Sequence, residues 1–197
     1  MSQLLLATHN EHKRREFARM LAARSGRVGW EVIALSPDVT LPPELGSTFA
    51  QNATGKARAA ATATGQVTIA DDSGIEAAAL GGAPGIRSAR YAGEHASDEE
   101  NLAKLLREAP AGSALRYVCA LAYVDPVTRR EQLFHGYCSG TLADSPRGEG
   151  GFGYDPAFLP REGPPGLTMA ELTDEQKDAI SHRGRAARAL LAWLTGG

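Results

Sequence analysis

The sequence has little of what stabilises secreted or membrane-embedded proteins. Only two cysteines, Cys119 and Cys138, occur among 197 residues, which excludes a disulfide framework and a Cys-x-x-Cys metal site. We expect both in the core. No apolar run approaches the roughly 20 residues that cross a bilayer. The first eight residues contain no basic segment, so we expect no signal peptide, a cytoplasmic location and no membrane partner.

The sequence also has no large net charge of either sign. Lysine and arginine total 21 and the acidic residues 23, so the formal net charge is −2. This balance excludes a generally basic nucleic-acid-binding protein, and we expect no nucleic-acid partner. Lysine itself is scarce, with only four residues, Lys13, Lys56, Lys104 and Lys177. Each lysine is therefore a candidate for a specific role.

Length and patterning predict an α/β protein forming a single domain over residues 1–197. Apolar runs predict strands at 3–7, 30–35 and 67–70, and a hairpin of 115–124 with 131–141. Helices are expected after the caps Asn10, Thr48 and Ser97. Residues 145–167 read as a long irregular loop, and 173–194 as a helix interrupted near 181–184. The sheet is expected to be mostly parallel or mixed.

A candidate anion site lies where the first strand leads into the first helix. Backbone N–H groups at a helix start, together with the helix dipole, favour bound anions. Thr8, His9 and Asn10 precede this helix, and Lys13 adds a charge one turn into it. The alternative interpretation is a plain capped helix with a surface lysine.

A second candidate site is Asp71-Asp72-Ser73-Gly74, which we place at the end of the third strand. Ligand crevices of open α/β sheets lie outside such strand ends, and Mg²⁺ typically takes one or two carboxylates plus substrate phosphates. The alternative is an acidic turn closed by Gly74. Taken alone, Glu44 reads as a solvated loop acid and Lys56 as a surface charge.

Two further segments carry groups suited to ligand binding. Glycines on both sides of Phe152, in residues 148–156, let the backbone approach a ligand, and an aromatic ring there can stack on a nucleobase. Lys177, His182 and Arg183 offer several hydrogen-bond donors. The alternatives are core aromatics under a surface loop and a helix-end cluster. Neither a nucleophile elbow nor a metal-ligand spacing of histidines is present.

The order of these segments along the chain resembles the inosine/xanthosine triphosphate pyrophosphatase family. The matching segments are 6–13, 48–53 with Lys56, 69–74, 80–91, 150–156, 171–172 with Lys177, and 181–184. The resemblance implies a two-lobed, elongated, mixed α/β fold with helices flanking the sheet, and a homodimer. It implies Mg²⁺-dependent hydrolysis of ITP, dITP, XTP and dXTP to the monophosphate and pyrophosphate.

The resemblance also implies roles for individual residues. Phosphates would be held by Thr8, Asn10, Lys13 and Lys56, and His9 would be a further substrate-binding residue. Asp72 would be the key carboxylate, acting on the attacking water or its metal, with Glu44 as the second metal ligand. Substrate contacts would come from Ser73, Phe152 stacking on the purine, Gly153, Tyr154, Asp155, Lys177, His182 and Arg183. His9, where many members have Gly, and Gln51, where Glu is common, depart from the family pattern.

Two other functions fit parts of the sequence. A Maf-like nucleotide pyrophosphatase, which has a similar fold, would act on pyrimidine or modified nucleotides. A non-catalytic nucleotide sensor would keep Phe152 and the lysines without needing metal carboxylates. The presence of Glu44, Asp71 and Asp72 argues against the sensor.

Overall fold

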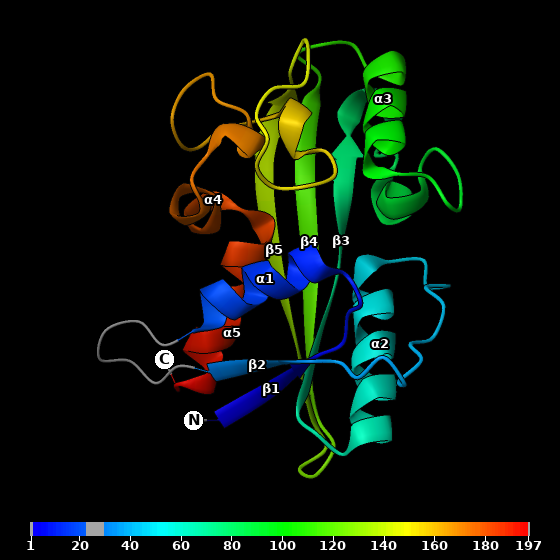
Figure 1. Cartoon of the computed structure of the whole chain (residues 1–197), viewed down its shortest axis with the longest axis vertical. Coiled ribbons are helices and arrows are strands. Elements are labelled where there is room, and N and C mark those ends of the chain that lie inside the picture. The colour runs from blue at the N-terminus through cyan, green and yellow to red at the C-terminus, as the bar shows by residue number, and fades with distance from the viewer. Residues whose placement is uncertain (1, 23–29, 197) are drawn as a thin grey trace. The chain divides into compact units, whose positions relative to one another are not determined.

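The computed structural model describes residues 2–22 and 30–196 (Figure 1). The strands are β1 (Ser2–Leu6), β2 (Trp30–Ala34), β3 (Thr68–Ala77), β4 (Ala114–Asp125), β5 (Arg130–Leu142) and β6 (Phe158–Pro160). The α-helices are α1 (Glu11–Leu21), α2 (Phe49–Thr64), α3 (Asp98–Glu108), α4 (Asp174–Ile180) and α5 (His182–Leu194). None of the described helices has the length and apolar character needed to cross a membrane.

The strands form one six-stranded sheet in the order β2-β1-β3-β4-β5-β6. β1 pairs in parallel with both β2 and β3, whereas β5 pairs antiparallel with β6. The sheet is therefore mixed, which confirms the predicted α/β class.

The chain divides into two compact units that are interleaved in the sequence. Unit 1 contains Met1–Asp72, Cys119–His135 and Arg185–Gly197, and unit 2 contains Ser73–Val118 and Gly136–Gly184. The boundaries fall inside β3, β4, β5 and α5. Long regular elements therefore belong to both units, and no linker separates them.

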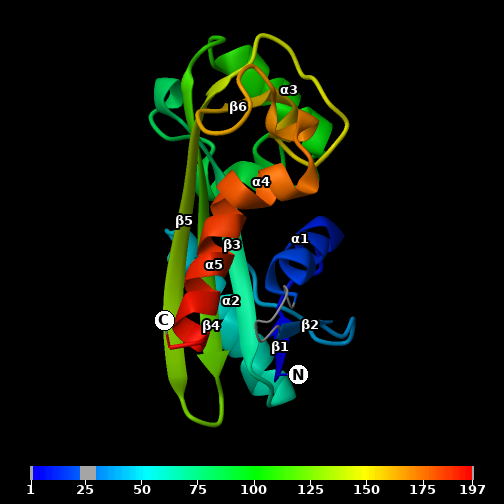
Figure 2. The same cartoon turned by 90° about the vertical axis from the view of Figure 1, so that its left-hand side faces the viewer.

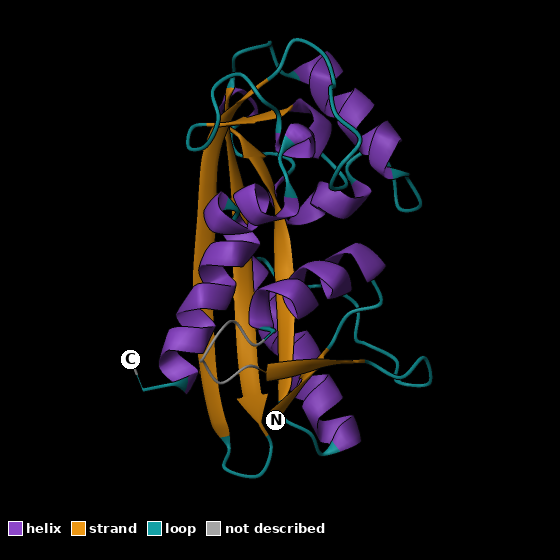
Figure 3. Ribbon diagram, turned by 60° about the vertical axis from the view of Figure 1, so that its left-hand side comes forward, coloured by secondary structure: helices purple, strands orange, loops and turns teal. Residues whose placement is uncertain are grey.

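Unit 1 has a core on each face of its strands. Successive residues of a strand point to opposite faces. Accordingly Leu4 and Leu6 of β1 pack in one core with α1 and α5, whereas Leu5 packs in the other with the alanines of α2. Figures 2 and 3 show these helices along the strands. The small alanine side chains bring α2 close to β3, which positions its polar residues beside the strand.

Unit 2 has a single core. Ile75 of β3 and Leu105 of α3 pack with residues of β4 and β5, and Phe158 and Met169 complete the core from the 143–172 segment. This long segment is mostly irregular, as predicted, but it contains the short strand β6. Because apolar residues of the 143–172 segment pack in the core, they anchor the glycine-rich loop at 148–156.

Most predicted element ends are confirmed. The side chains of Asn10, Thr48 and Ser97 each accept a hydrogen bond from a backbone N–H in the first turn of the following helix. The break in the last helical segment is at Ser181, between α4 and α5. Cys119 and Cys138 are buried, as expected.

One predicted strand end is wrong, and it concerns the site. The third strand does not stop at Ala70 but continues to Ala77, so Asp71 and Asp72 lie within β3 rather than after it. Aspartates indicate turns because their side chains can hydrogen-bond to the nearby backbone. Here Lys13 and Asn52 supply partners that allow both carboxylates to be buried in the sheet.

Candidate active site

Unit 1 gathers acidic and basic side chains from four parts of its sequence. They lie on β3, α1, α2 and the loop before α2. We call this group the acid–lysine cluster; its members are Lys13, Glu44, Asn52, Lys56, Asp71 and Asp72. The fold thus brings Glu44 and Lys56, which look like isolated surface charges when each is taken alone, into the same cluster as Asp72.

Both lysines of the cluster make ion pairs with carboxylates. Lys13 Nζ lies 3.0 Å from Asp71 Oδ2, and Lys56 Nζ lies 2.5 Å from Glu44 Oε1. The Lys56 side chain is only 9% exposed, so its reading as a surface charge is wrong. Burial by itself lowers the pKa of Lys56, but the charges of Asp71, Glu44 and Asp72 raise it overall. Lys56 therefore remains a cation inside the protein.

Asp72 is held by a residue to which the sequence assigned no role. Asn52 Nδ2 donates to Asp72 Oδ2 at 2.9 Å, and Asn52 Oδ1 accepts from the Gly46 N–H at 2.8 Å. Asn52 therefore connects the strand carrying Asp72 to the loop carrying Glu44. Asn52 precedes Lys56 by four residues, so both side chains lie on one face of α2. This spacing is the feature of the sequence that could have identified Asn52 as a site residue.

The environment of Asp72 opposes its negative charge. Burial raises the pKa of this carboxyl group, and the charge of Glu44 raises it further, while Lys56, the Asn52 hydrogen bond and Lys13 lower it in part. A carboxylate with a raised pKa is a stronger base than an exposed aspartate. Asp72 is therefore suited to accepting a proton or binding a cation.

The chemistry of the cluster fits a hard divalent cation. Glu44 and Asp72 are carboxylates close enough for the charge of one to raise the pKa of the other, and a cation would relieve this repulsion. Among residues 2–22 and 30–196, no three His, Cys, Asp or Glu side chains are placed to hold a metal by themselves. The donor set thus fits a metal that also takes oxygen ligands from a phosphate.

The segment before α1 is a capped helix start. Asn10 Oδ1 accepts from the Lys13 N–H at 3.0 Å, and Thr8 Oγ1 accepts from the Asn10 N–H at 3.1 Å, while His9 is exposed. The capping interpretation is thus confirmed. The same interpretation also placed Lys13 at the surface. That part is wrong, because the Lys13 side chain is only 14% exposed and is paired with Asp71.

Unit 2 carries a second group of residues, six of them predicted site residues and one, Tyr117, not predicted, centred on a buried aspartate. We call it the aromatic–cation cluster; its members are Ser73, Tyr117, Phe152, Asp155, Lys177, His182 and Arg183. Asp155 Oδ1 accepts from the Tyr117 hydroxyl at 2.9 Å. Asp155 Oδ2 accepts from Lys177 Nζ at 2.7 Å and from the Phe152 N–H at 3.0 Å. Asp155 therefore fixes the loop that carries Phe152.

The Phe152 ring lies among cations. Arg183 Cζ is 4.9 Å and Lys177 Nζ 5.4 Å from its centroid, and the ring is only partly buried. Arg183 also donates to Ser73 Oγ at 2.7 Å. A planar group stacked on Phe152 would therefore lie beside hydrogen-bond donors.

The neighbours of Phe152 anchor the loop. The Tyr154 hydroxyl donates to the Ser88 carbonyl at 2.7 Å, and the Gly153 N–H donates to Asp98 Oδ2 at 2.9 Å. Tyr154 is buried in the unit 2 core, so the core interpretation is confirmed for Tyr154.

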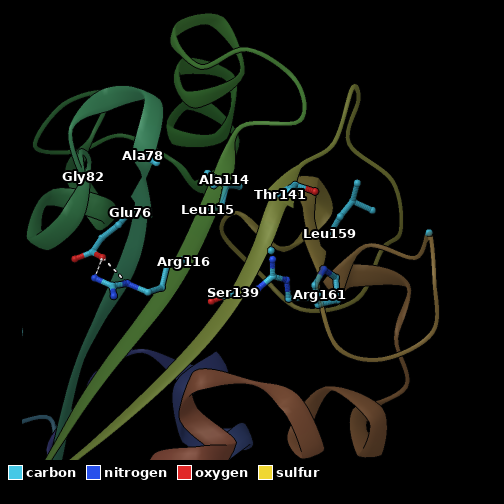
Figure 4. Close-up of a pocket in the computed structure, with 13 residues that line it drawn as sticks. Glu76, Ala78, Gly82, Ala114, Leu115, Arg116, Ser139, Thr141, Leu159 and Arg161 are labelled. Atoms are coloured by element: carbon cyan, nitrogen blue, oxygen red, sulfur yellow. Dashed lines mark hydrogen bonds and ion pairs between the residues drawn. The ribbon is translucent and has the colours of Figure 1, made fainter.

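A pocket of about 740 Å³ also lies in unit 2. Figure 4 shows Glu76 and Arg116 at its edge, joined by an ion pair in which Arg116 Nη2 lies 2.6 Å from Glu76 Oε2. Ser139, Thr141 and Leu159 line other parts of it. None of the predicted site residues lines this pocket.

Known proteins match the chain over nearly its whole length. The model of the Ham1 family matches residues 4–193. The protein named dITP/XTP pyrophosphatase in Geobacillus kaustophilus (strain HTA426) is 48% identical, over 96% of this chain and 93% of its own. The protein of that name in Cutibacterium acnes (strain DSM 16379 / KPA171202) is 45% identical, over 97% and 95%.

A solved structure agrees in fold as well as in sequence. The structure of a HAM1 protein from Coxiella burnetii covers 100% of both chains, with a TM-score of 0.83 and 36% identity. The two clusters of charged and aromatic residues thus lie on a fold shared with these proteins. By its sequence and by its fold, this chain belongs to the Ham1 family, as the order of its motifs predicted.

Proposed function

We propose that this protein hydrolyses dITP, ITP, XTP and dXTP to the nucleoside monophosphate and pyrophosphate. The observation that carries this proposal is the acid–lysine cluster, in which partly or fully buried lysines and carboxylates provide the positive and negative charges that a metal–triphosphate complex requires. The relatives named dITP/XTP pyrophosphatase support the choice of reaction and substrate. The protein would thereby remove non-canonical purines from the nucleotide pool.

The triphosphate would bind at the acid–lysine cluster and the adjoining helix start. Lys13 and Lys56 would neutralise phosphate oxygens after leaving their carboxylate partners. Thr8, His9 and Asn10 would contribute hydrogen bonds beside the N-terminus of α1, where the helix dipole favours anions. Positioning and charge neutralisation supply most of the catalysis in displacements at phosphorus.

Glu44 and Asp72 would hold the divalent cation, for which we propose Mg²⁺. When bound, it supplies neutralisation of the charge that develops on the phosphate oxygens. The Asp72 carboxylate would accept a proton from the water that attacks the α-phosphorus. Asn52 would keep Asp72 oriented through the hydrogen bond to Oδ2.

The base would be recognised by the aromatic–cation cluster. Phe152 would stack on the purine, and Arg183 or His182 would donate to the 6-keto oxygen that hypoxanthine and xanthine share. Adenine has an amino group there, so a donor would be left unpaired at a cost of roughly 1–3 kcal/mol. Ser73, Gly153, Tyr154, Asp155 and Lys177 would complete the substrate contacts, directly or by fixing the loop.

Three wider properties belong to the same proposal. Residues 1–197 would act as one catalytic domain with two lobes, the protein would form a homodimer, and it would work in the cytoplasm. Family membership supports the first two, and substrates from the free nucleotide pool support the third.

A substrate panel tests the proposed reaction. Pyrophosphate and phosphate release would be measured separately with Mg²⁺ for dITP, XTP, dATP, dGTP, dUTP and dTTP. We expect pyrophosphate from dITP and XTP, with about 10–100-fold less from dATP. Activity confined to pyrimidines would instead support a Maf-like enzyme, and binding without turnover would support a sensor.

A further inference from the structure

We propose that Tyr117 is a positioning residue for base recognition, acting through Asp155 on Lys177 and the Phe152 backbone and through its ring on His182. The inference rests on the proposed function, and it adds a residue that none of the sequence motifs contains. Tyr117 lies on β4, within the unit 2 core.

The hydroxyl of Tyr117 determines how Asp155 is oriented. Asp155 is 4% exposed, and both of its oxygens are used: Oδ2 by Lys177 and the Phe152 N–H, Oδ1 by Tyr117. Without the hydroxyl, the described donors act on Oδ2 alone, and rotation of the carboxylate about its Cβ–Cγ bond is less restricted. Tyr117 therefore restricts a carboxylate that bonds both to Lys177 and to the backbone of the Phe152 loop.

The protonation state of Tyr117 suits this role. Burial raises its pKa well above the ordinary value, and the neighbouring charge of Asp155 raises it further. The hydroxyl thus keeps its proton and acts as a donor to the carboxylate. A hydrogen bond to a charged acceptor is among the stronger ones in proteins.

The ring of Tyr117 supports a second predicted base contact. It lies parallel to the His182 imidazole, with centroids 4.5 Å apart and an interplanar angle of 9°. It also packs against the Phe158 ring, with centroids 4.5 Å apart and the two planes tilted by 35°. One side chain thus joins His182, Asp155 and the core on which the loop rests.

The test is Tyr117→Phe, which keeps the ring and removes only the hydroxyl. Calorimetry with Mg²⁺ present would measure two ligands: a dITP analogue with nitrogen bridging the α- and β-phosphates, and inorganic tripolyphosphate, which has no base. We expect the analogue to bind about tenfold more weakly, which equals the net loss of one hydrogen bond. Tripolyphosphate binding should not change, and KM for dITP should rise more than kcat falls.

Tyr123→Phe is the matched control, because Tyr123 is a buried tyrosine of the same strand that packs on Trp193. It should leave both affinities unchanged. Equal weakening of both ligands by Tyr117→Phe would mean a purely structural role and overturn the inference, as would unchanged binding of the analogue. Failure of the unmodified protein to cleave dITP would instead overturn the proposed function.

Discussion

The surroundings of Asp72 in the folded protein disfavour the ionised form of its carboxyl group. Its burial and the nearby charge of Glu44 both raise its pKa. Because the folded-state pKa is raised, the ionised form is less stable in the folded than in the unfolded chain. This destabilisation is present above the folded pKa and is relieved as the pH falls through it.

We expect Asp72→Asn to separate activity from stability. Pyrophosphate release from dITP should fall by about 10²–10⁴-fold, the range for loss of a general base. With divalent ions removed by EDTA, the variant should melt at a higher temperature than the unmodified protein at pH 7–8. The difference should shrink as the pH falls through the raised pKa of Asp72.

Asp71→Asn provides the contrast for this experiment. Asp71 is fully buried and pairs with Lys13, so its loss leaves a largely buried lysine without that carboxylate and lowers the melting temperature. A lower melting temperature for Asp72→Asn as well would contradict our account of the Asp72 environment.

At the scale of elements, the loop at 148–156 depends on glycine for two different reasons. Gly151 and Gly153 both have positive φ, +71° and +63°. A Cβ at Gly153 would meet nothing within 4 Å, whereas one at Gly151 would overlap Asp155 Oδ2 and lie 3.0 Å from Lys177 Nζ. Only Gly151 therefore combines backbone strain with close approach to the aromatic–cation cluster.

We expect Gly151→Ala to weaken substrate binding more than Gly153→Ala does. Both variants should lose about 1–2 kcal/mol of unfolding free energy from the left-handed backbone. Gly151→Ala should also displace Asp155 and raise KM for dITP, while Gly153→Ala should raise KM less. Chemical denaturation and initial-rate kinetics measure the two effects, and an equal rise in KM would refute the distinction.

At the scale of the whole molecule, the acid–lysine cluster predicts how ligands stabilise the protein. Glu44 and Asp71 are already paired with lysines. A divalent cation alone must compete with these lysines, whereas a triphosphate draws the lysines to itself and releases the carboxylates. Metal and triphosphate should therefore assist each other's binding.

We expect Mg²⁺ with the non-cleavable dITP analogue, at about 100 times its Kd, to stabilise the fold by about 2.7 kcal/mol. For a chain of this length that corresponds to a rise in Tm of roughly 5–10 °C. Mg²⁺ alone should produce a much smaller rise in thermal melts. Equal shifts with and without the analogue would exclude this coupling, and NaCl at the same ionic strength controls for salt effects.

The local features of this protein can be predicted from its sequence. Helix caps at Asn10, Thr48 and Ser97, the hairpin and the α/β class depend on neighbouring residues and apolar periodicity, and all were predicted. The order of the motifs was enough to identify the family, because each motif keeps its residue types and its place along the chain.

Which charged side chains are buried, and which partners neutralise them, depends on the tertiary structure. Lys56 reads as a surface residue and Asp71-Asp72 as a turn, because sequence patterns assume that charges seek water. Lys13, Asn52 and Glu44 reach these residues only after distant segments pack together. Tyr117 has no motif of its own, and its role arises from contacts with Asp155 and His182, 38 and 65 residues further along the chain. Such long-range contacts depend on packing, which local sequence does not specify.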